Sequence, residues 1–298
     1  MTTEAICDAL RAAFGGAWTL RPLHSGSFCE TWLARDQTGL RLFVKTAPED
    51  RAAMLHAEAV GLRALAANGS IRTPTIAVLA DLPSGGALLA LEWLDLRPAD
   101  AACSARFGEQ LATMHAQPQD RFGWGEANFL GATVQVNGWT HSDHVSCWIA
   151  FWRDMRLDAM RQRLMSRAAC PTLVSAVSAV CDAFPALFAD GHTPRPSLIH
   201  GDLWSGNWAM DAAGDPVIFD PAISHSDAEA ELAMLELFGN PPSGFWAAYN
   251  ARYPLRPGYA RRRSLYQLYH LLNHALLFGG VYTRKALDCA QDVLGARP

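Results

Sequence analysis

The sequence predicts an α+β protein with two unequal lobes: a small antiparallel β lobe with one helix (residues 1–95) and a larger α-helical lobe (residues 96–298). Short β-prone runs bounded by turn residues fill most of the first 95 positions. From about residue 100, apolar side chains instead recur three and four positions apart. The composition fits a folded chain with sizeable cores, because 50% of the 298 residues are hydrophobic and 18% are charged.

The first lobe is expected to be a sheet interrupted by a helix. Its predicted strands are residues 18–23, 29–35, 40–46, 75–79 and 87–94. The turn Asp36-Gln-Thr-Gly39 would join the second and third strands as a hairpin. Residues 51–67 change to a helical period and are followed by the stop signal Asn68-Gly69. Residues 94–100 are the expected hinge between the lobes.

The second lobe is expected to be mostly helical. The first helix follows residue 100, and the others are predicted at 143–166, 172–190, 226–238, 243–252 and 259–278. Two short apolar pieces, 197–199 and 216–219, are flanked by turn residues. We expect these two pieces to pair as a small hairpin that carries the chemical motifs.

A polar motif with a regular spacing lies beside these two pieces. The sequence His200-Gly-Asp202-Leu-Trp-Ser-Gly-Asn207 matches the spacing His-x-Asp-x-x-x-x-Asn, and Asp220 follows an apolar strand thirteen residues later. Kinases need a carboxylate that orients or deprotonates the acceptor hydroxyl, and oxygen ligands that hold Mg²⁺. The spacing predicts Asp202 for the first role, with Asn207 and Asp220 for the second. An ordinary turn in which Asp202 and Asn207 act as caps is the alternative, and it leaves Asp220 unexplained.

The nucleotide side has its own candidates in the first lobe. Lys45 ends a predicted strand and Glu58 lies in the following helix, which is the arrangement of a kinase lysine and its glutamate partner on the ATP phosphates. Ser25-Gly26-Ser27 would lie over the phosphates, although Ser and Gly between two strands are also typical of a simple hairpin. Glu92-Trp93-Leu94 closes the last strand of this lobe, where its backbone groups would meet adenine. ATP and Mg²⁺ are therefore the expected cofactors.

Charge and cysteine usage exclude several other classes. The net charge is −4, and the charged residues are dispersed, so no patch favours nucleic acid. Seven cysteines without a CxxC pair predict neither a zinc site nor a disulfide framework, and no apolar run is long enough to span a membrane. His270 and His274 are one helical turn apart but lack the Glu of a zinc protease motif. We expect a cytoplasmic protein.

Several longer stretches carry a family resemblance. They are Leu55-His-Ala-Glu-Ala-Val-Gly-Leu-Arg-Ala-Leu65, Phe122-Gly-Trp124, Gln135-Val-Asn137, residues 200–207, Val217-Ile-Phe-Asp-Pro-Ala222, Leu265-Tyr-Gln-Leu-Tyr-His-Leu-Leu-Asn-His274 and Phe278-Gly-Gly280. On these stretches the chain resembles the fructosamine-3-kinase (ketosamine kinase) family, within the aminoglycoside-phosphotransferase-like branch of protein-kinase-like folds. The resemblance implies ATP-dependent phosphorylation of a sugar hydroxyl on a ketosamine, free or linked to a lysine, and a role in deglycation.

The resemblance also implies roles for individual residues. Trp204 would pack against the sugar, and Asn273 and His274 would contact the acceptor. After Asp220-Pro-Ala222 the family carries an aromatic pair and a Gly-His-Arg element, whereas this chain reads Ile223-Ser-His-Ser-Asp-Ala228. The effect of this segment, redox regulation through Cys29, and the choice between monomer and homodimer stay open.

Two other functions fit the same motifs. An aminoglycoside or other small-alcohol phosphotransferase would use the same two-lobed site with another acceptor, because a fold does not fix a substrate. A regulatory protein that binds a nucleotide without catalysis is the second alternative, although such proteins usually lose at least one of the five charged or amide groups Lys45, Glu58, Asp202, Asn207 and Asp220.

Overall fold

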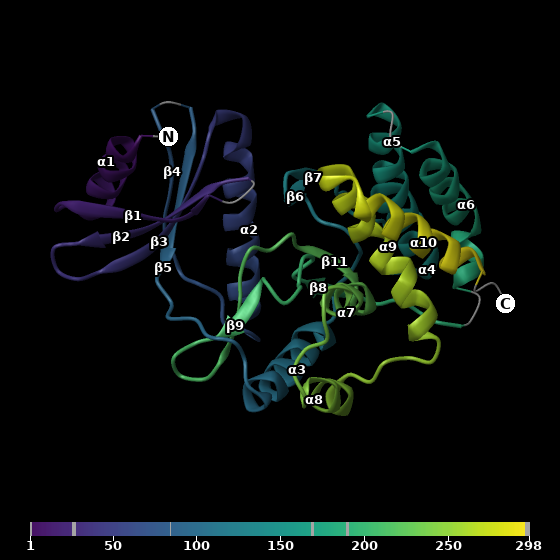
Figure 1. Cartoon of the computed structure of the whole chain (residues 1–298). Coiled ribbons are helices and arrows are strands. Elements are labelled where there is room, and N and C mark those ends of the chain that lie inside the picture. Colours follow the sequence, from purple (N-terminus) through teal and green to yellow (C-terminus); the bar gives the residue numbers. More distant parts are fainter. Residues whose placement is uncertain (1, 26–27, 84, 168–169, 189–190, 296–298) are drawn as a thin grey trace.

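The chain folds into a small β lobe and a larger helical lobe (Figure 1). This is a computed structural model that describes residues 2–25, 28–83, 85–167, 170–188 and 191–295. The arrangement confirms the predicted fold class. The division of the chain between residues 95 and 96 stays a prediction.

The small lobe is built on one antiparallel five-stranded sheet with the strand order β1-β2-β3-β5-β4. Its elements are α1 (Thr3–Phe14), β1 (Trp18–Ser25), β2 (Glu30–Asp36), β3 (Arg41–Ala47), the 3₁₀ turn η1 (Glu49–Arg51), α2 (Ala52–Asn68), β4 (Ile76–Asp81) and β5 (Ala87–Glu92). The predicted hairpin at Asp36–Gly39 joins β2 to β3, with Arg35 opposite Arg41.

The alternation of side chains along β5 gives this sheet two apolar faces. Leu88 and Ala90 pack on one face with Ile6 and Leu10 of α1. Ala87, Leu89 and Leu91 pack on the other face with α2. Successive side chains of a strand point to opposite faces, so a run of five buried apolar residues can serve both helices at once. Figure 1 shows α1 and α2 on opposite sides of the sheet.

The described part of the helical lobe contains three small two-stranded sheets among its helices. Its elements are α3 (Ala101–Ala116), β6 (Asn128–Leu130), β7 (Thr133–Gln135), α4 (Val145–Trp152), the π-helix η2 (Arg153–Asp158), α5 (Ala159–Ser166), α6 (Pro171–Leu187), β8 (Pro196–Ile199), β9 (Trp208–Met210), β10 (Pro216–Ile218), β11 (Ser224–Asp227), α7 (Ala228–Leu237), α8 (Phe245–Arg252), α9 (Tyr259–Phe278) and α10 (Val281–Gly295).

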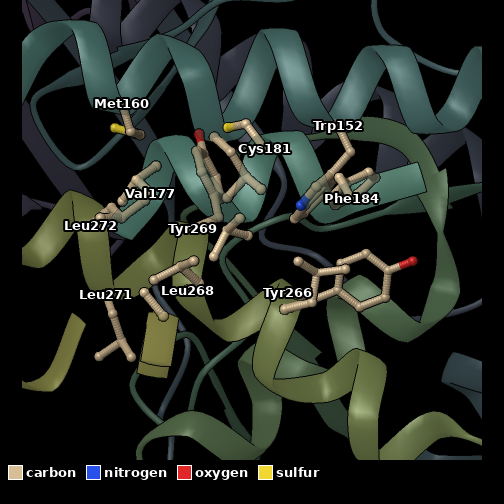
Figure 2. Packing of buried hydrophobic residues seen from close by; sticks show 14 of the residues in the cluster. Trp152, Met160, Val177, Cys181, Phe184, Tyr266, Leu268, Tyr269, Leu271 and Leu272 are labelled. Carbon is tan, nitrogen blue, oxygen red and sulfur yellow. The ribbon is translucent and has the colours of Figure 1, made fainter. Parts of the chain in front are cut away.

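The largest core of this lobe lies where α9 packs against α4, α6 and α10. Figure 2 shows Trp152, Phe184 and Tyr266 in this cluster, with Tyr269 nearby on the same helix as Tyr266. Burial of these large side chains stabilises the lobe by about 1.5–3 kcal/mol per residue. The core therefore fixes α9, which reaches the site with its C-terminal end.

The predicted pairing of 197–199 with 216–219 is wrong. Pro196–Ile199 pairs with Ser224–Asp227, and Pro216–Ile218 pairs with Trp208–Met210. Residues 200–207 and residues 219–223 therefore each connect the β8–β11 sheet with the β9–β10 sheet, and the chain after Asp220 pairs with β8. The helix expected at 226–238 begins at Ala228 for the same reason, because the preceding residues belong to β11.

Other boundaries also differ from the predictions. The helices α1 and α10 were not expected, and the helix expected at 143–166 is divided by the π-helix η2. Helix α6 ends at Leu187 rather than at residue 190, and β5 ends at Glu92, which leaves Trp93 and Leu94 in the connection between the lobes. Among the described residues, no helix has the length and apolar character needed to cross a membrane.

Candidate active site

The catalytic loop, residues 200–207, places Asp202 and Asn207 side by side. The Asn207 amide nitrogen donates to the Asp202 backbone oxygen at 2.8 Å and to Asp202 Oδ2 at 3.2 Å. Asn207 is buried, whereas Asp202 is partly exposed to the cleft. Because its nitrogen is used on Asp202, the remaining oxygen Oδ1 is the atom of this side chain that can ligate a cation.

The segment 220–223, which we call the Asp220 segment, is held against this loop by backbone hydrogen bonds. Ala222 N donates to His200 O at 2.8 Å, and Phe219 N donates to Asn207 O at 3.0 Å. Asp220 has a φ of 60°, a left-handed conformation that is uncommon outside glycine. Strained residues of this kind cluster at functional sites, where the surroundings hold them in place.

Lys45 of β3 joins the two lobes electrostatically at Asp220. Its Nζ donates to Glu58 Oε1 at 2.7 Å and also to Asp220 Oδ1. Lys45 lies opposite Leu89 in the sheet, on the face that α2 covers, which is why it meets Glu58 of that helix. The predicted pair of Lys45 and Glu58 is therefore present, with Asp220 as a third member.

Burial and charge shift the pKa values of these groups in ways that suit their chemistry. Burial raises the pKa of Asp202 well above its usual range, and the Asp220 charge adds to this shift. Burial also raises the pKa of Glu58 to about 7, against the opposing effect of Lys45. Burial alone would lower the pKa of Lys45, but the carboxylates of Asp220 and Glu58 outweigh it and raise that pKa. Lys45 therefore stays a cation, and Asp202 binds a proton more readily than a surface carboxylate does.

Glu231 of α7 fixes the start of the catalytic loop by hydrogen bonds to its backbone. Its carboxylate accepts from His200 N at 2.5 Å and from Gly201 N at 3.0 Å. His200 Nε2 in turn donates to Phe219 O at 2.8 Å, just before Asp220. The sequence reasoning missed Glu231, which is 1% exposed. A glutamate between apolar residues of a predicted helix was the available signal.

Two cavities meet at Asp220. One, of about 330 Å³, contains both Asp202 and Lys45, and the other, of about 570 Å³, lies at the connection between the lobes. The predicted residues that line the first are Lys45, Glu58, Asp202, Trp204, Asn207, Asp220, Asn273 and His274. The predicted residues that line the second are Glu92, Trp93, Leu94 and Asp220. The site is thus one cleft with two compartments, which suits two reactants that exchange a group at their boundary.

The first cavity has walls that the sequence reasoning missed. Phe129 and Gly131 come from the β6–β7 hairpin, and Phe28 comes from the connection between β1 and β2. A Cβ on Gly131 would lie 3.1 Å from the Phe28 ring, so the two lobes touch here. Cys29 also lines this cavity as a free thiol, and burial raises its pKa.

Asn273 and His274 of α9 offer polar atoms to the same cavity. The Asn273 nitrogen donates to Leu130 O at 3.2 Å, while its buried Oδ1 has no hydrogen-bond partner among the described residues. His274 Nδ1 donates to His270 O at 2.9 Å, and burial lowers the pKa of His274. A neutral imidazole with Nδ1–H engaged leaves Nε2 as an acceptor. Both side chains can therefore accept hydrogen bonds from hydroxyl groups.

Part of the predicted nucleotide loop lies outside the described residues. These are Gly26 and Ser27, while the backbone of Ser25 ends β1. The Glu92 side chain accepts from Thr75 N at 2.9 Å, so it stabilises the strand end. Trp93 Nε1 donates to Asp95 Oδ1 at 2.8 Å.

Comparisons with known proteins cover almost the whole chain. The sequence profile of the family described as fructosamine kinase matches residues 3–296. The chain is similar to a probable ketoamine kinase of Synechocystis, with 40% identity over 85% of this chain and 83% of that protein. It is also similar to the ketosamine-3-kinase of Mus musculus, with 31% identity over 91% and 94% of the two chains. A crystal structure of a candidate fructosamine-3-kinase from Thermobifida fusca superposes with a TM-score of 0.85 and 31% identity, covering 99% of this chain and 100% of the other.

Proposed function

Since this chain belongs to the fructosamine kinase family, we propose that it transfers the γ-phosphoryl group of ATP to a sugar hydroxyl of a ketosamine. A ketosamine is the Amadori adduct of a sugar with an amine, and phosphorylation makes the adduct labile, so the proposed role is deglycation. The observation that carries this proposal is the convergence of Lys45, Asp202, Asn207 and Asp220 on one cleft with two compartments. The alternative of a regulatory protein without catalysis has no support in this set, because all of these groups are present.

Asp202 is the proposed catalytic residue. It lines the cavity next to Trp204, and its Oδ2 is oriented by the Asn207 amide. A carboxylate with a raised pKa can accept the proton of the acceptor hydroxyl as the new bond to phosphorus forms. Its second oxygen can hydrogen-bond the hydroxyl and direct it towards the phosphoryl group.

Lys45 is proposed to bind the α- and β-phosphates of ATP. In the structure its charge is shared between Glu58 and Asp220. The bond to Glu58 holds the ammonium at the cleft, and the phosphates would take the place of Asp220 as its second anionic partner. Release from Lys45 would free the Asp220 carboxylate for a cation.

The proposed cation is Mg²⁺, held by Asn207 and Asp220. These residues fit it, because a carboxylate and an amide oxygen are hard oxygen ligands and Asp220 is about half exposed to the cleft. When bound, the metal would neutralise the negative charge of the phosphates. The backbone of residues 92–94 is the proposed contact for adenine, because these residues line the second cavity.

The proposed acceptor contacts are Trp204, Asn273 and His274. Trp204 is 37% exposed and stands at the cavity as a flat apolar surface on which a sugar ring can pack. Asn273 Oδ1 and His274 Nε2 would accept hydrogen bonds from the sugar hydroxyls. A cytoplasmic location and a monomeric or homodimeric state stay predictions.

Most of the divergent segment Ile223–Ala228 is buried. Ile223, Ser224 and Ser226 are buried, and Ser224–Asp227 forms β11. The segment lines neither of the two cavities. We propose that its altered sequence acts on local packing rather than by direct contact with the acceptor.

The proposal is tested by ATP turnover with Mg²⁺ and a panel of acceptors. The panel contains fructoselysine, ribuloselysine and kanamycin, and each is assayed with the wild type and with Asp202→Asn. We expect turnover with at least one ketosamine that falls by about 100-fold or more in the variant, because positioning and proton transfer are both lost. Turnover of kanamycin without any ketosamine would support an aminoglycoside phosphotransferase instead. Equal turnover by the variant would contradict the role of Asp202.

A further inference from the structure

Two buried amide side chains mark the β6–β7 hairpin. Asn128 begins β6 and Gln135 ends β7, and both are 5% exposed or less. The two residues lie opposite one another in the hairpin, and Gln135 Nε2 donates to Asn128 Oδ1 at 2.7 Å. Buried amides are costly unless all of their polar atoms are paired, so their partners show what they hold.

Both amides reach the Asp220 segment. Gln135 Nε2 also donates to Ala222 O at 3.1 Å, and Asn128 Nδ2 donates to Ile223 O at 2.7 Å. These are the second and third residues after the strained Asp220. The Ala222 carbonyl also lies close to the catalytic loop, because a Cβ on Gly201 would lie 2.1 Å from this oxygen. Gln135 therefore holds a carbonyl that lies between the segments carrying Asp202 and Asp220.

The network leaves these side chains a single orientation. Gln135 Oε1 accepts from the Tyr269 hydroxyl at 2.9 Å, and Asn128 Oδ1 accepts a second bond from Asn137 Nδ2 at 3.2 Å. Rotating the Gln135 amide by half a turn would set its oxygen against the Ala222 carbonyl. A buried network in which each of these amide nitrogen and oxygen atoms has a partner resists displacement.

The tip of the same hairpin forms a wall of the first cavity, which contains the proposed acceptor contacts Trp204, Asn273 and His274. Phe129, Leu130 and Gly131 line that cavity, and Leu130 O accepts from Asn273 Nδ2. The hairpin thus contacts the acceptor side at its tip and the Asp220 segment at its base. Its length is three residues per strand, so a shift at the base moves the tip with it.

We propose that Gln135 and Asn128 are positioning residues. They fix the position of the hairpin tip, residues 129–131, relative to the catalytic loop and the Asp220 segment. Their effect is to direct the phosphoryl group to the acceptor hydroxyl rather than to water. This inference rests on the proposed kinase function and adds to it a reason why the acceptor competes successfully with solvent.

The test compares Gln135→Met with wild type by measuring phosphorylated acceptor and ADP in the same reaction. Methionine keeps the length of the side chain but cannot donate to Ala222 O. We expect the rate of acceptor phosphorylation to fall by about 10- to 100-fold, as a misplacement near 1 Å can do. The yield of phosphorylated acceptor per ADP should fall as well. The dissociation constant for ATP should stay within about twofold, because Gln135 bonds neither Lys45 nor the backbone of residues 92–94, which are the proposed contacts for the phosphates and for adenine.

Two further variants keep this test decisive. Gln267→Met is the matched control, because Gln267 also donates from its amide to a backbone carbonyl, that of Ala233, on the far side of α9 from the hairpin network. Tyr269→Phe removes only the bond that orients Gln135 and should lower the yield per ADP less than Gln135→Met. The positioning role is wrong if Gln135→Met lowers the rates of acceptor phosphorylation and of ADP formation but leaves the yield of phosphorylated acceptor per ADP unchanged. It is also wrong if Gln267→Met lowers this yield equally.

A readout without any acceptor separates this inference from the proposed substrate. Backbone hydrogen exchange in the presence of ATP and Mg²⁺ should rise in Gln135→Met at residues 129–133 and at residues 220–224 together. Faster exchange in the hairpin alone would overturn the coupling, whichever acceptor the enzyme uses. If the wild type phosphorylates no ketosamine, the proposed substrate fails, and the exchange measurement still decides the positioning role.

Discussion

The substitution Glu231→Gln tests how the catalytic loop is held in place. Glu231 lies in α7, is 1% exposed, and accepts from the backbone nitrogens of His200 and Gly201. Glutamine keeps the size of the side chain but replaces one acceptor oxygen by an NH₂ group. One of the two backbone N–H groups would then face a donor.

The magnitude follows from these two bonds. A hydrogen bond to a charged group contributes about 1.5–3 kcal/mol, and a buried N–H without a partner costs about 1–3 kcal/mol. Removal of a buried charge offsets part of this loss. We expect a net decrease of about 2 kcal/mol in the free energy of unfolding. For a chain of this size that corresponds to a decrease of about 4 °C in Tm.

The assay combines thermal unfolding with steady-state kinetics. Asp202 directly follows Gly201, so we expect kcat to fall by about tenfold or more, while the dissociation constant for ATP changes little. Glu236→Gln is the matched control, because Glu236 lies on the same helix and accepts from Arg263 and Tyr259 instead of from the loop. A Glu231→Gln protein with the wild-type kcat would refute the reasoning, and so would an equal loss of kcat in Glu236→Gln.

Three further substitutions test other parts of the site. Lys45→Met leaves Glu58 buried without its cation. Burial already raises the pKa of Glu58 to about 7, and removal of the cation raises this pKa further. The decrease in Tm relative to wild type should therefore be larger at pH 8 than at pH 6. Adding Glu58→Gln should remove this pH dependence, and a loss equal at both pH values would contradict the account. Asp202→Asn should raise Tm at pH 8, because burial raises the pKa of Asp202 and its ionisation therefore destabilises the folded state. The expected gain in the free energy of unfolding is about 0.5–2 kcal/mol. This gain should vanish near pH 4, and a gain that persists there would be inconsistent with this cause. Gly201→Ala combines a φ of 83° with a Cβ that would lie 2.1 Å from a backbone oxygen. In thermal unfolding it should lose more stability than Gly39→Ala, a position with a positive φ and open space around the added Cβ. Equal losses of stability would show that the clash at Gly201 is relieved.

The sequence was sufficient to predict the two lobes and the groups that carry charge at the site. The spacing of His200, Asp202 and Asn207 is local, and their chemistry depends on residue type, so both can be read without coordinates. Lys45 and Glu58 required only one strand and one helix to be placed in the right order. In the fold, Lys45 of β3 lies opposite Leu89 on the face of the sheet that α2 covers, and this brings it to Glu58 of that helix.

The pairing of the short strands could not be derived in the same way. The strands β8, β9, β10 and β11 have three or four residues each, which is too short for a side-chain period to specify a partner. The polar sequence Ser224-His-Ser-Asp227 forms a strand because its backbone pairs with β8, and its own residue types do not favour one. Tertiary contacts therefore decided these elements.

The supporting residues of the site were missed for a related reason. Glu231 resembles an exposed helical glutamate until the catalytic loop is placed on it. Gln135 and Asn137 lie in one of the stretches that carry the family resemblance, but the Gln135 partner Ala222 lies in the Asp220 segment, 87 residues further along the chain. Buried polar side chains are specified by what surrounds them, and a single sequence does not contain that information.

The central claim is tested most directly by identifying the product of the reaction. Wild-type protein is incubated with ATP, Mg²⁺ and fructoselysine, and the phosphorus spectrum of the mixture is followed by NMR. We predict a new phosphomonoester signal on the sugar that grows in proportion to ADP and does not form with Asp202→Asn. ADP that accumulates only with inorganic phosphate, or a phosphomonoester that forms equally with Asp202→Asn, would contradict the account.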